Sequence, residues 1–264
     1  MANDFSILER YGIKEVCDVT FYEIQEDKNG QIVPGKPVLY LDTLKVSTVE
    51  QTAENVAARG GKGNPELVVW DYGKEITLNL EDAVFSSKSL AMMFGTVPKV
   101  PGDYTTLKKI LPKSQLKYDA DDSVFKYTMH GQEYEVALAD MKWYNMQGAE
   151  AEEKTVQIVD DEPDLSDVDY AEFDVELKEQ SEIDINSDTF PGTYYVTGDT
   201  YARSEKDGQD EFLQLIIPKA KMLSEVTLTM EAEGDPSTFN MSMKVLRPTD
   251  KNMMKLIKYD IKTE

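Results

Sequence analysis

The residue types that most often perform covalent or acid–base chemistry are scarce in this chain, which contains one histidine, His130, and one cysteine, Cys17. A Ser-His-Asp or Cys-His arrangement would have to use His130, because its nucleophile needs an adjacent general base. His130 precedes Gly131 in a predicted hairpin turn, where an exposed histidine is expected. Cys17 lies at an alternating position of the first predicted strand and is interpreted as a small buried apolar residue. The same counts exclude a zinc site of ordinary composition.

A glycine-rich run at residues 59–64 (RGGKGN) is the second candidate for chemistry, because such loops can cradle phosphate groups. The run lacks the GxxxxGK[ST] spacing, and the residues after it read as strands and not as a helix. A run of turn-formers with a basic tip, in an acidic protein, is better explained as a contact with an acidic surface of a neighbour.

Acidic clusters at residues 119–122 and 160–162 supply the hard oxygen ligands that calcium prefers. Neither cluster has the DxDxDG…E register with its mid-loop glycine. Paired carboxylates for glycoside hydrolysis cannot be told from the solvated face of a strand here. We therefore predict no catalytic residues, no metal site and no cofactor, and a protein that is not an enzyme.

Aromatic residues offer one alternative of another class. Residues 141–146 (MKWYNM) are rich in aromatic and methionine side chains, for which core packing is the expected role. In the alternative, the chain is a monomeric β-sandwich module that binds carbohydrate or peptide. Its stacking platform would consist of Trp143, Tyr144, Tyr194 and Tyr195.

The elements that must position these residues are mostly short strands. Asn29-Gly30 signals a hairpin turn after a strand pattern at residues 15–26. Further strand-length runs lie at residues 123–129, 133–138, 192–202, 212–218, 225–233, 238–246 and 253–261. Short strands with regular turns and a single short helix predict a mainly β fold, an antiparallel sandwich or barrel.

One stretch, residues 38–95, organises the rest. Residues 38–46 alternate as a strand, and residues 47–65 are interpreted as a polar arm without core-forming side chains. Residues 67–80 are expected to form two strands that turn near residues 71–73. Residues 81–94 then have the period of a short helix, which Gly95 would cap.

Composition bounds the class of protein. The chain has 264 residues, of which 41% are hydrophobic and 30% charged, with 50 acids, 28 bases and a net charge of −22. Such a surface disfavours binding to the outside of nucleic acid, which needs a basic stripe. A lone cysteine permits no internal disulfide, and we expect neither a signal peptide nor a segment that spans a membrane.

Acidic residues are concentrated in the middle of the chain. Residues 160–188 contain thirteen acids and one base, a net charge of −12 and more than half of the total. Apolar residues alternate with acids at residues 173–177, which favours a strand with one solvated face. We interpret residues 97–189 as an acidic inserted domain between residues 1–96 and 190–264, which would together form one core domain.

Three segments carry a resemblance to a known family. They are LDTLKVSTVEQTAENVAARGGKG at residues 41–63, WDYGKEITLNLEDAVFS at residues 70–86 and FLQLIIPKAKMLSEVTLTMEAEGDPSTFNMSMKVLRP at residues 212–248. Together they resemble the tail tube protein of a tailed bacteriophage, a family similar to the tube proteins of type VI secretion. The resemblance covers about the first hundred and the last seventy residues and leaves the middle unexplained.

The resemblance implies two antiparallel sheets packed as a barrel-like sandwich, one flanking helix and a long loop between subunits. Six copies would close a ring, and stacked rings would form a tube whose lumen conducts DNA during ejection. The loop would correspond to the arm, which we expect to order only on assembly, and its contact residues are assigned by position alone. They are Gln51, Asn55, Arg59, Lys62 and Trp70.

The implied partners are further copies of the chain, with sheath, baseplate and tail-terminator proteins as additional candidates. DNA would pass through the lumen without specific binding, since a negative wall repels phosphates. The protein would be assembled in the host cytoplasm and reside in the virion tail. A structural alternative is a tail-terminator or baseplate tube-like protein that forms a single ring.

Overall fold

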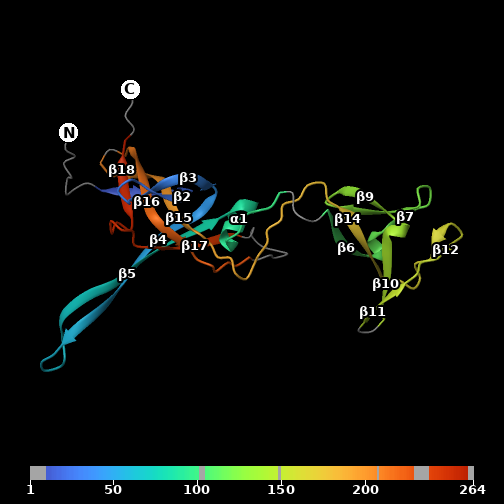
Figure 1. Cartoon of the computed structure of the whole chain (residues 1–264), viewed down its shortest axis with the longest axis horizontal. Coiled ribbons are helices and arrows are strands. Elements are labelled where there is room, and N and C mark those ends of the chain that lie inside the picture. The colour runs from blue at the N-terminus through green and yellow to red at the C-terminus, as the bar shows by residue number, and fades with distance from the viewer. Residues whose placement is uncertain (1–9, 101–104, 148–149, 207, 229–237, 261–264) are drawn as a thin grey trace. The chain divides into compact units, whose positions relative to one another are not determined.

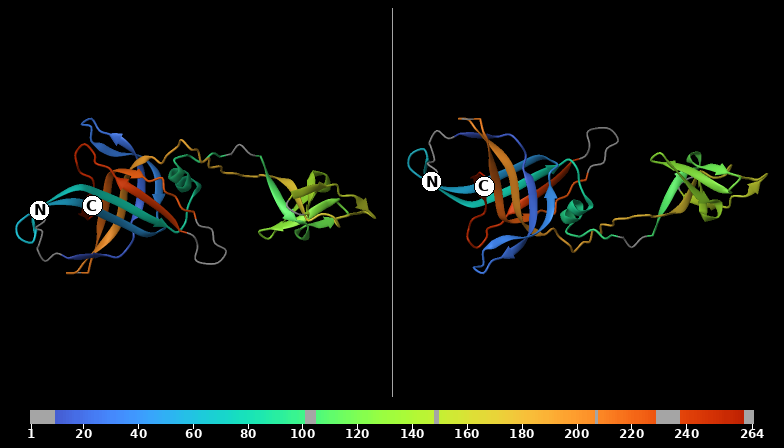
Figure 2. Two further views of the ribbon diagram at one scale, coloured as in Figure 1. Left: turned by 90° about the horizontal axis from the view of Figure 1, so that it is seen from below. Right: turned by 90° about the horizontal axis from the view of Figure 1, so that it is seen from above.

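The computed structural model describes residues 10–100, 105–147, 150–206, 208–228 and 238–260. The chain divides into two compact units, which are described separately below (Figures 1 and 2). Unit 1 comprises Met1–Pro98 and Ile183–Glu264, and unit 2 comprises Lys99–Glu182. Both are built mainly from antiparallel strands, which confirms the predicted fold class.

Unit 1 contains one helix, α1, and a nine-stranded sheet among its described residues. The strand order is β3-β2-β15-β16-β17-β5-β4, while β1 also pairs with β15 and β18 with β16. The strands are β1 (Tyr11–Ile13), β2 (Asp18–Glu26), β3 (Ile32–Leu41), β4 (Leu44–Arg59), β5 (Glu66–Asp82), β15 (Thr193–Ser204), β16 (Asp210–Met222), β17 (Phe239–Val245) and β18 (Lys255–Tyr259); the helix is α1 (Ser87–Phe94).

One apolar face of this sheet surrounds a single core. Every second residue of β5 from Ile76 to Asp82 is buried, as are alternate residues of β17, so these strands have an inner and an outer face there. The described pairings form an open path whose ends, β3 and β4, are not joined. A barrel closed by hydrogen bonds, one of the two expected forms, is therefore not present among the described strands.

Helix α1 covers one part of the core. Ser86 and Ser89 form a reciprocal capping box at its start, and Gly95 ends it with a φ of 76°. Met92 and Met93 are buried against the sheet. The predicted cap at Gly95 is confirmed, but the helix begins later than residue 81 because β5 continues to Asp82.

Three expectations for residues 38–80 were wrong. The chain turns between β3 and β4, so residues 38–46 are not one strand. Residues 47–59 continue β4 and pair with β5, so most of the predicted loose arm is strand. Gly73, with a φ of 62°, lies at an irregularity of the continuous strand β5 and not in a turn. The polar composition of β4 reflects exposure along an edge strand.

The expected strand at residues 225–233 is a further correction. Residues 225–228 have no strand structure, and residues 229–233 lie outside the described residues. The other strand patterns of the last part of the chain correspond to β15, β16, β17 and β18.

Unit 2 packs a four-stranded sheet, in the order β11-β10-β14-β6, against the three-stranded sheet β7-β8-β9, with β12 and β13 as a small separate hairpin. Its strands are β6 (Thr106–Pro112), β7 (Lys117–Asp119), β8 (Val124–Met129), β9 (Gln132–Ala137), β10 (Met141–Gln147), β11 (Glu150–Lys154), β12 (Ile158–Val159), β13 (Glu162–Pro163) and β14 (Tyr170–Glu176). Two single-turn 3₁₀ helices, η1 (Lys113–Gln115) and η2 (Leu138–Asp140), connect them.

Unit 2 has a core of its own. Phe125, Trp143 and Phe173 are almost fully buried, with Phe125 in ring contact with Trp143 at 5.1 Å between centroids. The expected core role of residues 141–146 is thus confirmed for their inward-facing members. His130 and Gly131 adopt positive φ angles in the turn between β8 and β9, as the hairpin signal predicts.

Candidate functional site

The residues considered first for catalysis belong to different units of the chain. His130 is exposed in a turn of unit 2, while Cys17 is half-buried in unit 1. Burial raises the pKa of the Cys17 thiol, so it stays protonated near neutral pH and is a poor nucleophile. Among the described residues, no three His, Cys, Asp or Glu side chains are grouped so that they could hold a metal ion. No described helix has the length and apolar character needed to cross a membrane.

The four aromatic residues of the carbohydrate-binding alternative do not form a platform. Trp143 and Tyr195 are buried, with 3% and 8% of their surface exposed. Tyr144 belongs to unit 2 and Tyr194 to unit 1. The alternation of strands explains the failure, because adjacent residues such as Trp143 and Tyr144 point to opposite faces of a sheet.

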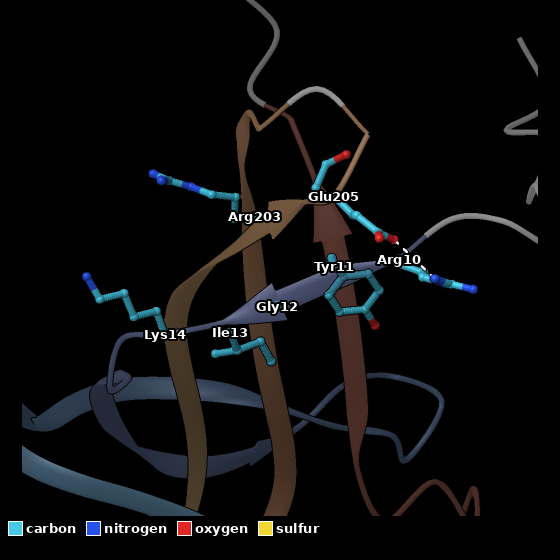
Figure 3. A pocket seen from close by; sticks show the side chains of 8 residues that line it. Arg10, Tyr11, Gly12, Ile13, Lys14, Arg203 and Glu205 are labelled. Carbon is cyan, nitrogen blue, oxygen red and sulfur yellow. Dashed lines mark ion pairs between the residues drawn. The ribbon is translucent and has the colours of Figure 1, made fainter.

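A shallow groove of about 540 Å³ lies beside β1, between residues 10–14 and residues 203–205 (Figure 3). Its arginines are already engaged: Arg203 makes two hydrogen bonds of 2.6 Å to Asp210, and Arg10 pairs with Glu205 at 3.6 Å. In Figure 3 the Lys14 side chain points away from Tyr11. The groove therefore lacks a convergent set of free polar groups of the kind that small-ligand sites use.

The most distinctive feature of unit 1 is a long hairpin that leaves the sheet. β4 and β5 pair from Leu44–Asp82 to Arg59–Glu66, but β17 supports β5 only along its last six residues, 77–82. The outer part, residues 54–72, has no third strand among the described residues, and we call it the arm. Figure 1 shows it as a ribbon that extends away from the body of unit 1.

A register shift marks the base of the arm. The pairing slips between Thr52 and Glu54, opposite Gly73, whose positive φ suits a glycine. Irregularities of this kind bend a strand and increase its twist. The irregularity therefore separates the arm from the part of the hairpin that β17 supports.

Apolar side chains are exposed on the arm. Val56 lies directly opposite Trp70, and Ala58 opposite Val68, so these four residues share one face with Tyr72. We call this the tryptophan face. The large side chains of this face are about half exposed: Val56 to 53%, Val68 to 48%, Trp70 to 55% and Tyr72 to 53%. The opposite face carries Leu67 and Val69, which are 64% and 49% exposed.

Such a ribbon is poorly stabilised on its own. A two-stranded hairpin in water is marginal at best, and burial of apolar surface contributes about 25 cal/mol per Å². At the tip, residues 60–65 are held by two backbone hydrogen bonds of 3.2 Å, and Arg59 pairs with Glu66. The arm gains little burial within its own subunit, so covering its apolar face would stabilise it substantially.

The five contact residues expected from sequence are all exposed along β4, β5 and the tip. Asn55 lies opposite Asp71 and therefore on the other face from Trp70, and Arg59 is engaged by Glu66. Sequence reasoning missed Val56, Val68 and Tyr72. The alternation of residues 68, 70 and 72 was visible, but only the pairing of β4 with β5 shows that Val56 joins them.

Free strand edges are the second feature of unit 1 that suits assembly. β3 and β4 end the strand order, and no further strand pairs with their outer edges among the described residues. Unpaired edges recruit other strands unless they are protected.

In a comparison with families of known proteins, the model of the YomU/Tube protein family matches residues 11–258. A comparison with curated proteins gives no match.

Proposed function

Since the chain belongs to the YomU/Tube protein family, a family of phage tail tube proteins, we propose that it is the subunit of a tail tube built from stacked six-membered rings. The observation that carries this proposal is the arm: an exposed ribbon with an apolar face, on a subunit that leaves the face uncovered. Copies of one chain that cover each other's arms are the economical solution.

The edges of the sheet support ring closure. An edge strand of one copy can pair with the edge of the next, and a closed ring of identical copies leaves no edge unpaired. β4 offers an edge of 16 residues for this purpose and β3 one of 10 residues. In this proposal, Gln51, Asn55, Arg59, Lys62 and Trp70 contact neighbouring subunits.

The tube would conduct DNA and bind none of it specifically. The chain carries a net charge of −22, and a negative lumen repels phosphates, so that the genome slides. Unit 2 would lie outside the tube, where a large acidic elaboration cannot obstruct the lumen. Sheath, baseplate and tail-terminator proteins would be the other partners, in a particle assembled in the host cytoplasm. The role is structural and involves no catalysis.

Electron microscopy of the purified protein at high concentration, with sedimentation alongside, tests the proposal. Stacked six-fold rings or tubes are expected. In the matched variant an Asn-Gly turn replaces residues 55–71. The turn joins Glu54 to Tyr72, which are paired across the hairpin. This shortened hairpin keeps the base of β4 and β5 and should not stack.

The same measurement separates the structural alternative. Isolated rings that never stack, even at high concentration, would favour a tail-terminator or baseplate role. A protein that stays monomeric alone and with its virion partners would contradict both proposals. Stacking that survives loss of residues 55–71 would show that the arm is not the assembly element.

A further inference from the structure

The structure shows a second exposed apolar surface, at the end of unit 1 away from the arm. We propose that this surface receives the tryptophan face of the arm from a second copy of the chain. The inference rests on the proposed function, and names which surface of one subunit the arm of another would cover.

The surface is a row of three aromatic rings across three neighbouring strands. Tyr201 of β15, Phe212 of β16 and Tyr259 of β18 lie directly opposite one another and therefore on one face. Ring centroids are 5.3 Å apart for Tyr201 and Phe212 and 5.5 Å apart for Phe212 and Tyr259. We call these residues the aromatic row. The row lies on the face opposite the core, and its tyrosines are accordingly exposed, Tyr201 to 47% and Tyr259 to 36%.

Polar pairs border the aromatic row on both sides. Arg203 and Asp210 are bonded to each other at the next pair on this face, and Asp199 accepts a hydrogen bond of 2.8 Å from Gln214 at the previous one. The polar groups at this rim are satisfied within the subunit. An apolar centre inside a satisfied polar rim is the usual anatomy of a protein interface.

The dimensions of the two surfaces match. Residues 68, 70 and 72 of the arm and residues 259, 257 and 255 of β18 are alternate positions, and each set spans about 13 Å at 3.3 Å per residue. The arm can therefore lie along β18 face to face, as two packed sheets do. Ile257, which is 41% exposed, would then face Trp70.

Charge favours the same alignment. Glu54 lies opposite Tyr72 and therefore at the base end of the tryptophan face, while Lys255 lies at the far end of β18 from Tyr259. With Val68 placed on Tyr259, Glu54 and Tyr72 approach Lys255, so that opposite charges meet at the margin of the contact.

The position of the two surfaces requires a second copy. In Figure 1 the arm runs downward from the body of unit 1, whereas β18 lies at its upper side. The arm of a subunit therefore does not cover the aromatic row of the same subunit. A contact between two different surfaces is heterologous, and repetition of such a contact generates closed rings or open stacks.

Cross-linking between differently labelled copies tests the contact. One protein carries Val68→Cys and the other Ile257→Cys, both in a Cys17→Ser background, and a short bismaleimide is added to the mixed assembly. A cross-linked pair is expected. The matched control replaces Val68→Cys by Glu50→Cys, an exposed position of β4 outside the arm, and should not react with Ile257→Cys.

A second variant measures the contribution of the aromatic row. Tyr201→Ser with Tyr259→Ser should raise the concentration needed for assembly about tenfold or more, as loss of central aromatic contacts does. Tyr134→Ser removes a tyrosine of β9 in unit 2 that is 40% exposed and should leave this concentration unchanged. Circular dichroism shows whether each variant is folded.

The outcomes distinguish this contact from the function on which it rests. Assembly with no cross-link between positions 68 and 257, or an unchanged assembly concentration for the folded double variant, would overturn the contact and leave the tube subunit standing. Failure of the unmodified chain to assemble with itself or its virion partners would overturn the proposed function, and the contact with it.

Discussion

Gly95 combines two demands that no other residue type meets. It ends α1 in the left-handed region, with a φ of 76°, and its amide donates a hydrogen bond of 3.1 Å to the Met92 carbonyl. A Cβ atom at this position would collide with the Phe190 carbonyl and lie 2.7 Å from the Pro191 nitrogen. The absence of a side chain at Gly95 therefore lets the end of α1 pack against the backbone of Phe190 and Pro191, which precede β15.

Gly95→Ala should destabilise the protein by roughly 3 kcal/mol, because left-handed strain and a backbone collision add. Urea unfolding followed by circular dichroism measures the change. Gly30→Ala is the matched control: its φ of 73° is similar, but nothing lies within 4 Å of its added Cβ. About 1 kcal/mol is expected there. Equal losses for the two variants would contradict the collision.

Asp119 of unit 2 provides a test of pH dependence. A hydrogen bond of 2.6 Å from Lys126, and then one from the Asp121 amide, hold the pKa of the Asp119 carboxyl below its ordinary value of 3.8. A lowered pKa stabilises the folded state above the ordinary pKa, and this contribution is lost as the pH falls through the folded pKa. Asp119→Asn should therefore lower stability near neutral pH and matter less in acid.

Fluorescence of the buried Trp143 reports unfolding of unit 2, once the exposed Trp70 is replaced by Phe. The difference between the urea midpoints at about pH 6 and about pH 3 should be smaller in Asp119→Asn than in its parent, the protein that carries only Trp70→Phe. Asp140→Asn, a change at an exposed carboxylate of η2, is the control and should leave the difference near that of the parent. A parent without any such difference would contradict the assignment.

At the scale of elements, local patterns succeeded where one strand or turn decided the outcome. The Asn29-Gly30 and His130-Gly131 turns and the Gly95 cap depend on backbone angles that neighbouring residue types restrict. The sequence pattern does not predict the long hairpin, because β4 has no apolar alternation along residues 50–55. Its strand structure comes from pairing with β5, a contact that a pattern within β4 cannot reveal.

The arm should be the least protected part of the β4–β5 hairpin in the free subunit. Its pairs lack the core contacts that support residues 76–82, so they open locally at low free energy. Hydrogen exchange read by mass spectrometry should show fast exchange at residues 54–59 and 66–72 and slow exchange at residues 76–82. In the assembled protein, exchange in the arm should slow at least tenfold. Equal protection before and after assembly would contradict a role for the arm as a contact.

At the scale of the whole molecule, the two units satisfy their needs separately. The core of unit 1 is formed by residues from both of its segments, and the core of unit 2 lies entirely within residues 111–175. Composition revealed where the middle of the chain differs, since acids concentrate there. It did not reveal that residues 106–176 form two packed sheets, because the contacts that decide this join distant strands such as β6 and β14.

The ends of unit 2 make excision practical. Lys99 and Glu182 exchange two backbone hydrogen bonds, of 2.9 and 3.0 Å, so both connections leave the unit at one point. A variant that joins Pro98 to Ile183 through a short Gly-Ser linker should keep the core of unit 1 and still assemble. The control combines this excision of unit 2 with the removal of residues 55–71, and it should fold without stacking.

Charge gives the excised variant a second expected property. Unit 2 carries 21 acids and 9 bases, a net charge of −12, so its removal changes the total from −22 to −10. Like-charged copies repel each other, and salt screens this repulsion over a Debye length of about 10 Å at 0.1 M. Sedimentation across a salt series should therefore show assembly of the excised variant at lower ionic strength than the full chain needs. An excised protein that folds but never assembles would place unit 2 within the contacts of the tube.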